Sequence, residues 1–296
     1  MLTGTALGEF YALACAVVWA AAVILFKKSG EHLAPLPLAF FKNLLGLSLM
    51  LLTLLLWHQG SIPSLSIADV GLLLVSGLLG IAVGDSLYLR ALHRVGAAPV
   101  AVAQTLYSPF VILLSLAFLG ERLGLNQWLG VGLVLVGVLA VSAHGSPGLS
   151  RRDLAWGMGE GIAAVFAMAA GIVMAKPVLD RADFLAVVAV RMFAGVVGLF
   201  LVLLRGEGLA GLRADLAAVR DWRPIIAASV LGTYLSMMLW LAGYKYTKAS
   251  IAAVLNELAA IFILLLAVLF LRERVSARQV MGVLLAVSGV VMVVSM

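Results

Sequence analysis

The sequence predicts an all-α membrane protein in which ten transmembrane helices form two inverted five-helix repeats. Three observations predict this fold. Hydrophobic residues make up 64% of the chain and charged residues only 11%, against roughly 45–50% and about 25% in soluble proteins. Apolar runs long enough to cross a bilayer recur along the chain. The second half of the chain also repeats the first at a spacing of 152 residues.

Ten apolar runs approach the ~20 residues that a membrane-spanning helix needs. They lie at roughly 8–26, 36–57, 67–89, 97–119, 126–143, 154–175, 184–204, 225–243, 250–271 and 278–295. Each run is continuous, whereas a strand of a membrane barrel alternates apolar and polar residues. No Lys or Arg precedes the first run, so we expect a membrane helix there rather than a signal peptide.

Two longer breaks organise the chain. The break at 144–153 contains Gly145, Pro147 and Gly148 and leaves five runs on each side. It predicts two repeat units, residues 1–145 and 146–296. The break at 205–223 is charged and is expected to lie at one membrane surface. The remaining connections are short, so consecutive helices should be antiparallel neighbours.

The internal repeat is clearest in the last two helices of each half. At the spacing of 152 residues, Glu121-Arg122 falls on Glu273-Arg274, Phe110 on Phe262, Gly130 on Gly282 and Gln104 on Asn256. Earlier in each unit the spacing drifts, and Lys42 with Gly46 resembles Arg191 with Gly195. Because five is an odd number, the two units must cross the membrane in opposite directions, an arrangement that many secondary transporters use.

Composition and motifs narrow the function. With only four His and one Cys, the chain has few residues that could ligate a metal or take part in redox chemistry, and Cys15 has no second cysteine to pair with. The formal charge of +6 is spread over the loops, which indicates membrane-flank charge rather than nucleic-acid binding. No phosphate-binding glycine loop with Lys-Ser/Thr is present, so ATP-driven transport is not expected. We expect no cofactor, no metal and no enzymatic activity.

Gly120-Glu121-Arg122 and Arg272-Glu273-Arg274 each precede the last, Gly-rich helix of a unit. With ten spans and a five-plus-five repeat, they resemble the drug/metabolite transporter superfamily, and more narrowly the EamA family, which includes bacterial exporters of amino acids and other metabolites. The resemblance implies an inner-membrane protein with a central cavity formed mainly by the helices that precede the last one of each half. It also implies that the last helix of each half is peripheral and that both termini are cytoplasmic.

The distribution of loop charge predicts the opposite orientation. Cytoplasmic loops carry an excess of Lys and Arg. With the amino terminus inside, the inner loops would hold six of the 20 Lys and Arg residues, namely Arg122, Lys176, Arg181, Arg191, Lys245 and Lys248. This count favours both termini outside, and the orientation stays open.

Glu257 is the first candidate for substrate binding. It lies about seven residues into its span, about 10 Å deep at 1.5 Å per residue, and its repeat equivalent is Thr105. Polar groups at membrane depth are costly and tend to face a cavity or a neighbouring helix. We expect this carboxylate either to bind a substrate amine or a proton, or to pair structurally with a cation such as Lys42, Lys176 or Arg191.

The amides of Gln104 and Asn256 occupy equivalent positions in the two halves. Each amide can donate and accept hydrogen bonds. This property suits a zwitterionic substrate and equally suits a hydrogen bond between helices.

Aromatic residues recur in the same way. Tyr88 and Trp240 are repeat equivalents, Tyr107 follows Gln104 by three residues, and Trp19 lies in the middle of the first span. Together with Met residues they could wall a cavity that accepts side chains of varied shape. The alternative is an aromatic belt at the membrane interface, which we favour for Trp57, Trp128, Trp156 and Trp222.

Two further acids receive other interpretations. Gly84-Asp85-Ser86-Leu87 matches a hydrolase motif, but a nucleophile needs a nearby base and this tetrapeptide lies in a predicted membrane helix. We expect Asp85 to pair with Arg90 or Lys245 near a surface. Glu9 is too shallow for the deep carboxylate expected in the first helix of a small multidrug pump.

The sequence therefore predicts a secondary transporter of the inner membrane that exports small metabolites, most readily amino acids, by alternating access. The expected site residues are Gln104, Tyr107, Asn256, Glu257, Tyr88, Trp240 and Trp19. Expected partners are a small-molecule substrate and the lipid bilayer, with protons left open as coupling ions and the chain acting as a monomer or weak homodimer. The alternatives are a multidrug or other metabolite carrier of the same fold, a channel, and an intramembrane enzyme or lipid-handling protein.

Overall fold

The computed structural model describes residues 4–29, 33–60, 63–119, 125–142, 149–206, 208–246, 255–256, 258–272 and 275–294. Throughout these described ranges the regular structure is helical, without strands. Six helical segments are long and apolar enough to cross a membrane: Ala6–Ser29, Pro35–Trp57, Ile67–Val95, Ala97–Leu114, Arg151–Leu179 and Phe184–Arg205. The chain is a multi-pass membrane protein, and the number of ten spans remains a prediction.

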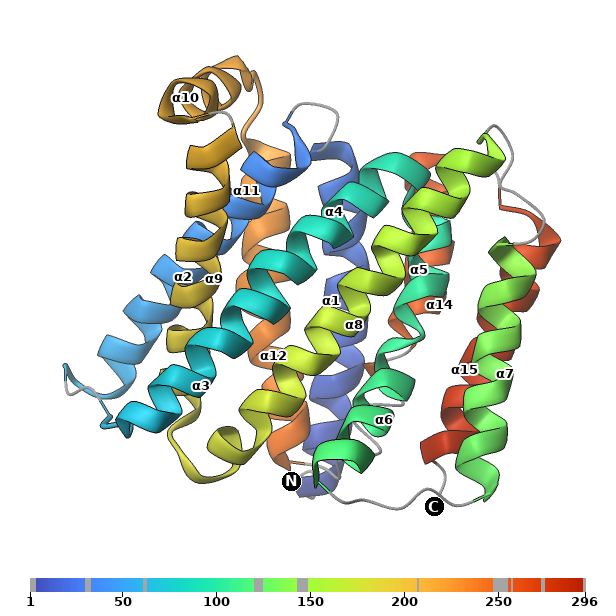
Figure 1. The fold of residues 1–296 in the computed structure, drawn as a ribbon, viewed down its shortest axis with the longest axis horizontal. Helices are drawn as coiled ribbons and strands as arrows, with labels where there is room; N and C mark the ends of the chain where they lie inside the picture. Colours follow the sequence, from blue (N-terminus) through green and yellow to red (C-terminus); the bar gives the residue numbers. More distant parts are fainter. Residues whose placement is uncertain are drawn as a thin grey trace.

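The first half contains α1 (Gly4–Ser29), α2 (Pro35–Trp57), α3 (Ile67–Gly77), the π-helical turn η1 (Leu78–Val83), α4 (Gly84–Val95), α5 (Ala97–Gln104), α6 (Tyr107–Leu119) and α7 (Leu125–Ser142). The second half contains α8 (Arg151–Arg181), α9 (Phe184–Gly206), α10 (Gly208–Ala218), α11 (Arg223–Ser229), the π-helical turn η2 (Val230–Leu235), α12 (Ser236–Tyr246), α14 (Ala259–Leu266), the π-helical turn η3 (Ala267–Leu271) and α15 (Ala277–Val294). α3, η1 and α4 follow one another without a gap and form a single passage through the bundle (Figure 1).

Local sequence signals set several helix boundaries. The Ser66 hydroxyl accepts a hydrogen bond from the Asp69 backbone N–H at 3.1 Å, and Ser150 caps α8 in the same way. Pro35 occupies the first turn of α2, where its missing N–H costs nothing. Gly96, with a φ of 86°, separates α4 from α5 in a left-handed conformation that favours glycine.

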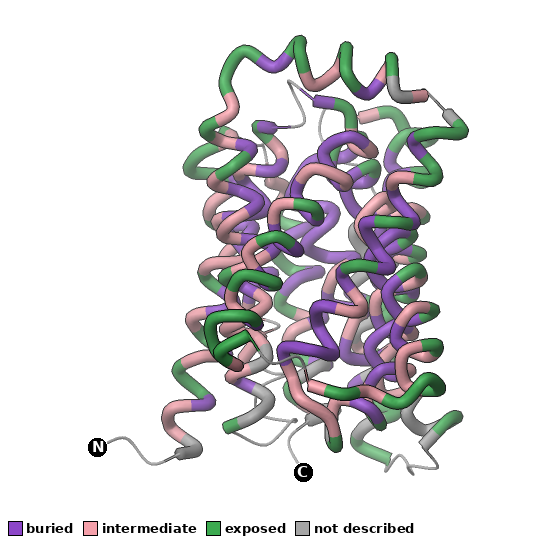
Figure 2. Tube along the Cα trace, turned by 90° about the vertical axis from the view of Figure 1, so that its left-hand side faces the viewer, coloured by how far each residue is buried: buried purple, intermediate pink, exposed green. Residues whose placement is uncertain are grey.

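The two halves run in opposite directions through the bundle. α1 begins and α15 ends at one end of the molecule, whereas α8 begins at the other end (Figure 1). α10 lies across this second end (Figures 1 and 2). It falls inside the charged break at 205–223, which the sequence predicts at a membrane surface.

Contacts between the halves form most of the bundle. α2 and α3 pack against α9, α4 packs against α8, and α1 packs against α11, α12 and α14. Buried residues lie along the inward faces of these helices, and exposed residues lie on the outside (Figure 2). Many of the exposed side chains are large and apolar, such as Leu56, Phe118 and Leu269. Apolar surface of this kind is stable against lipid, as expected for a membrane protein.

α7 and α15 pack mainly against each other at the edge of the bundle (Figure 1). A Cβ atom at Gly137 would lie 2.6 Å from the carbonyl oxygen of Gly282. Glycine therefore permits the close helix approach that the sequence predicts here. Gly132, on the same helix, has no neighbour within 4 Å of a Cβ atom and is not part of this contact.

Candidate functional site

A cavity of about 240 Å³ lies between the two halves. Its walls come from α1, α2, η1, α4, α5, α6, α8, α9, η2, α12, α14 and residue 256. Both repeat units therefore contribute to one site. A site between repeats in the middle of the bundle is the usual location for substrate in secondary transporters.

Interrupted helices bring polar groups to the cavity. α5 ends at Gln104, and α6 begins at Tyr107. In the second half, Leu255 and Asn256 are helical, and α14 begins at Ala259. The turn at Leu258 corresponds to the turn at Leu106 at the 152-residue spacing, so in each repeat a turn lies between a helical amide that lines the cavity and the next helix.

The π-helical turns η1 and η2 are also equivalent at this spacing. Extra turns of this kind often occur at functional sites, because they redirect the side chains that follow them. Gly80 of η1 and Gly232 of η2 line the cavity, and so do Tyr88 and Trp240 of the helices that follow.

Six of the seven predicted site residues line this cavity: Trp19, Tyr88, Gln104, Tyr107, Trp240 and Asn256. The Tyr88 hydroxyl donates to Gln104 Oε1 at 3.2 Å, and the rings of Trp19 and Tyr88 lie 5.9 Å apart. Glu257, the seventh, lies outside the described residues. The substrate-binding role of all seven stays a prediction.

Several buried polar atoms around the cavity have no hydrogen-bond partner among the described residues. They are Nδ2 and Oδ1 of Asn256, Nε1 of Trp19, Oγ1 of Thr233 and Oγ of Ser236. An unsatisfied buried donor or acceptor costs about 1–3 kcal/mol. Such groups are therefore available to a polar ligand.

An ion pair in the cavity wall corrects the prediction for Asp85. This carboxylate pairs with Lys42, whereas the sequence argument named Arg90 or Lys245. It also accepts a hydrogen bond from Asn43 Nδ2 at 2.6 Å. The side chains of Lys42 and Asp85 are only 5% and 13% exposed, so the pair lies inside the bundle and not at a surface. The sequence argument failed because spacing along the chain does not show which helices pack together, and the packing of α2 against α4 is what brings Lys42 to Asp85.

Arg191 is the second cation of the cavity. The charge count placed Arg191 in a loop, but it lies within α9. Its Nε donates to Ser76 Oγ at 2.9 Å, and this hydroxyl donates to the Gly171 carbonyl oxygen at 2.5 Å. The sequence did contain a signal for these residues, because charged groups within apolar spans usually face a cavity. Lys42 and Arg191 are also aligned with each other in the internal repeat, at the part of each unit where the spacing departs from 152 residues.

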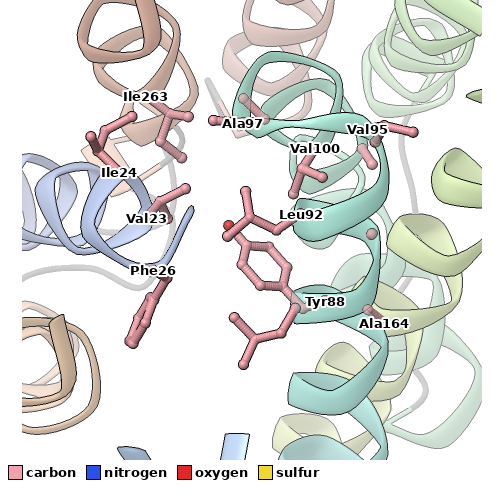
Figure 3. Close-up of a cluster of buried hydrophobic side chains, with 14 of the residues drawn as sticks. Val23, Ile24, Phe26, Tyr88, Leu92, Val95, Ala97, Val100, Ala164 and Ile263 are labelled. Atoms are coloured by element: carbon pink, nitrogen blue, oxygen red, sulfur yellow. The ribbon is translucent and has the colours of Figure 1, made fainter. Parts of the chain in front are cut away.

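Apolar packing closes the cavity toward the Gly96 end of the bundle. Leu92 and Val95 lie beyond Tyr88 on α4 and are 1% and 5% exposed. They belong to a buried cluster with Val100 of α5 and Ile24 of α1 (Figure 3). The inward side of α4 between Tyr88 and Gly96 is therefore packed in apolar surroundings.

In the described part of the chain, no group of three or more His, Cys, Asp or Glu side chains could hold a metal ion. The chemistry of the cavity is that of hydrogen bonding, charge and aromatic surface.

The chain is similar to known transporters over most of its length. The model of the EamA-like transporter family matches residues 6–143 and again 155–295. An uncharacterized transporter of Archaeoglobus fulgidus is 24% identical and aligns over 95% of each chain. The protein PecM of Dickeya dadantii is 27% identical over 75% of this chain and 72% of its own. One crystal structure has a TM-score of 0.69 at 18% identity, covers 97% of this chain and 96% of its own, and shows that the fold is shared. The family model matches nearly the whole chain in two successive copies, and the chain therefore belongs to the EamA-like transporter family.

Proposed function

We propose that the protein is a secondary carrier of the inner membrane that exports small metabolites, with amino acids as the first choice, by alternating access. The observation that supports this proposal most directly is the cavity between the halves. It combines aromatic walls with polar atoms that have no hydrogen-bond partner among the described residues, and an interrupted helix from each repeat reaches it.

The size of the cavity favours a small metabolite over a multidrug substrate. Pockets for drug-sized ligands measure about 300–1,000 Å³, whereas this cavity measures about 240 Å³. A small amphipathic molecule such as an amino acid suits this space and its mixed polar and aromatic walls.

Close contacts between the halves support a rocking mechanism. A Cβ atom at Gly46 would lie 2.5 Å from the Thr233 side chain, and one at Gly171 would lie 2.9 Å from Gly80. Surfaces of small residues allow helices to approach and slide. In the proposed cycle, the apolar cluster around Leu92 and Val95 separates while the opposite end closes.

We assign the substrate contacts to the residues that the sequence singled out. Gln104, Tyr107 and Asn256 provide hydrogen bonds, and Tyr88, Trp240 and Trp19 form the aromatic walls. Glu257 remains our candidate for binding a substrate amine. The units 1–145 and 146–296 are proposed as the two halves that move, within a monomer or a weak homodimer.

Counterflow of radiolabelled amino acids into liposomes that contain the purified protein tests this function. Flux should saturate with substrate concentration, and it should fall at least tenfold in Asn256→Ala and Glu257→Gln. Asn126→Ala makes the same type of change at an exposed position of α7 and should transport normally. If none of the 20 amino acids shows saturable counterflow, the proposed cargo is wrong.

The same liposomes separate the other functions. A channel shows flux without saturable counterflow, and an enzyme or lipid-handling protein changes the substrate or the lipid chemically. Repeating the assay with an imposed pH gradient distinguishes proton-coupled export from uniport.

A further inference from the structure

The two halves hold their cavity cations in different surroundings. Lys42 of α2 and Arg191 of α9 are repeat equivalents. Lys42 pairs with Asp85 and is followed by Asn43, which also bonds Asp85. The equivalents of Asp85 and Asn43 in the second half are Met237 and Met192, both of which line the cavity. The second half therefore has a cation at the same place, without the acid that neutralises the first cation and without the amide that donates to that acid.

The guanidinium of Arg191 is held in one orientation by its own contacts. Its Nε donates to Ser76, a fully buried residue whose hydroxyl proton is in turn donated to Gly171. A Cβ atom at Gly77 would lie 2.1 Å from the Arg191 carbonyl oxygen, so glycine lets α3 pack directly against α9 at this residue. Both the backbone and the inner part of the side chain are thus fixed.

The outer edge of the guanidinium faces the cavity, with no carboxylate of the described residues against it. A Cβ atom at Gly80, a cavity-lining residue, would lie 3.5 Å from Nη2 of Arg191. Among the described residues, no carboxylate oxygen lies within the 4.0 Å ion-pair distance of Arg191; the recorded ion pairs join other residues. Lys42, Asp85 and Arg191 together give the described cavity wall a formal charge of +1.

Arg191 is partly buried within an apolar span. A cation that lacks a counter-ion in such surroundings is costly, and this cost falls when an anion binds. Arginine presents its N–H groups in a planar fork that matches both oxygens of a carboxylate. We propose that Arg191 binds the carboxylate of the transported molecule, with Ser76 as the residue that positions it. This inference rests on the proposed function and narrows it, since cargo must carry a carboxylate and organic cations that lack one are excluded.

A pair of compounds that differ only in the carboxylate tests the anchor. L-phenylalanine and L-phenylalaninamide share the amine and the ring, and binding to the purified protein can be measured by isothermal titration calorimetry. We expect L-phenylalanine to bind roughly 10- to 100-fold more tightly than the amide, as for a hydrogen bond to a charged group. The preference should disappear in Arg191→Gln and persist in part in Arg191→Lys.

A glycine variant tests the geometry without removing the charge. Gly80→Ala places a methyl group beside Nη2 at an ordinary contact distance, so the fold should tolerate it while carboxylate binding weakens. Gly71→Ala, on the neighbouring α3 with nothing within 4 Å, is the matched control and should bind normally. Equal binding of the two compounds to the wild type, or an undiminished preference in Arg191→Gln, overturns the anchor.

A measurement without substrate separates this inference from the proposed cargo. Cys15 is the single cysteine of the chain and lines the cavity. Two methanethiosulfonate reagents, one that carries a sulfonate and one that carries an ammonium group, can be compared by their rates of reaction with Cys15. The ratio of the sulfonate rate to the ammonium rate should be higher in the wild type than in Arg191→Gln. If this ratio changes as expected but no amino acid is transported, the cargo is wrong and the anion site stands. If amino acids are transported and the ratio is unchanged, the anion site is wrong and the carrier stands.

Discussion

The buried pair of Lys42 and Asp85 leads to a quantitative prediction for the variant Asp85→Asn. The substitution keeps the shape of the side chain and removes its charge. Asn43 can still donate to the oxygen at position 85, because its Nδ2 lies 2.6 Å away. Lys42, only 5% exposed, loses its counter-ion inside the bundle.

The size of the effect follows from this burial. Removing one partner of a buried ion pair costs ~3–5 kcal/mol, because the other charge is left uncompensated. We expect about 3 kcal/mol, the lower end of this range, since the bond from Asn43 is retained and Lys42 borders the cavity. This loss corresponds to roughly a hundredfold change in the unfolding equilibrium.

A double-mutant cycle measures the pair itself. The free energies of unfolding of Asp85→Asn, Lys42→Met and the double variant can be obtained by titration with SDS in mixed micelles. The double variant should be more stable than the sum of the two single losses predicts, because it leaves no unpaired charge. Additive losses would refute the argument that the two side chains stabilise each other as a buried pair.

The exposed pair of Arg94 and Glu160 provides the control for the cycle. Its Nε–Oε2 distance is 3.1 Å, but the Arg94 side chain is 42% exposed. Solvent screens such pairs, which contribute about 0–1 kcal/mol. Arg94→Gln should therefore change the free energy of unfolding by less than about 1 kcal/mol.

Three further outcomes are expected. Gly137→Ala should lower the melting temperature, because its Cβ atom would meet backbone of α15, while Gly132→Ala on the same helix should leave it unchanged; equal melting temperatures would contradict this packing. Tyr88→Phe removes the hydrogen bond to Gln104 and should lower the free energy of unfolding by about 1 kcal/mol in the same SDS titration. A loss above about 3 kcal/mol would instead indicate that the Tyr88 side chain stabilises the fold by packing. A saturating transported amino acid should slow the reaction of Cys15 with N-ethylmaleimide, followed by mass spectrometry, and an unchanged rate would place the substrate outside this cavity.

Most of the fold could be predicted because lipid imposes a simple rule on the sequence. Apolar runs must be about 20 residues long, and the repeat at 152 residues showed which runs correspond. The same repeat aligned Gln104 with Asn256, and both line the cavity. The helix α10 was not foreseen as a helix, because its charged surroundings resemble those of a loop.

The sequence by itself determined the membrane environment, the twofold repeat and the gathering of amides and aromatics, since these depend on composition and spacing. Only the tertiary structure decided which polar and charged side chains meet. Asp85 and Lys42 are 43 residues apart, and Ser76 and Arg191 are 115 apart. Their pairing depends on how α2 packs against α4 and α3 against α9. Between helices in lipid such packing depends on close side-chain fit and hydrogen bonds, so the apolar pattern of the sequence does not specify it. In one repeat an acid therefore neutralises the cation, and in the other the cation faces the cavity. This difference follows from the packing of the helices and not from the spacing of the residues.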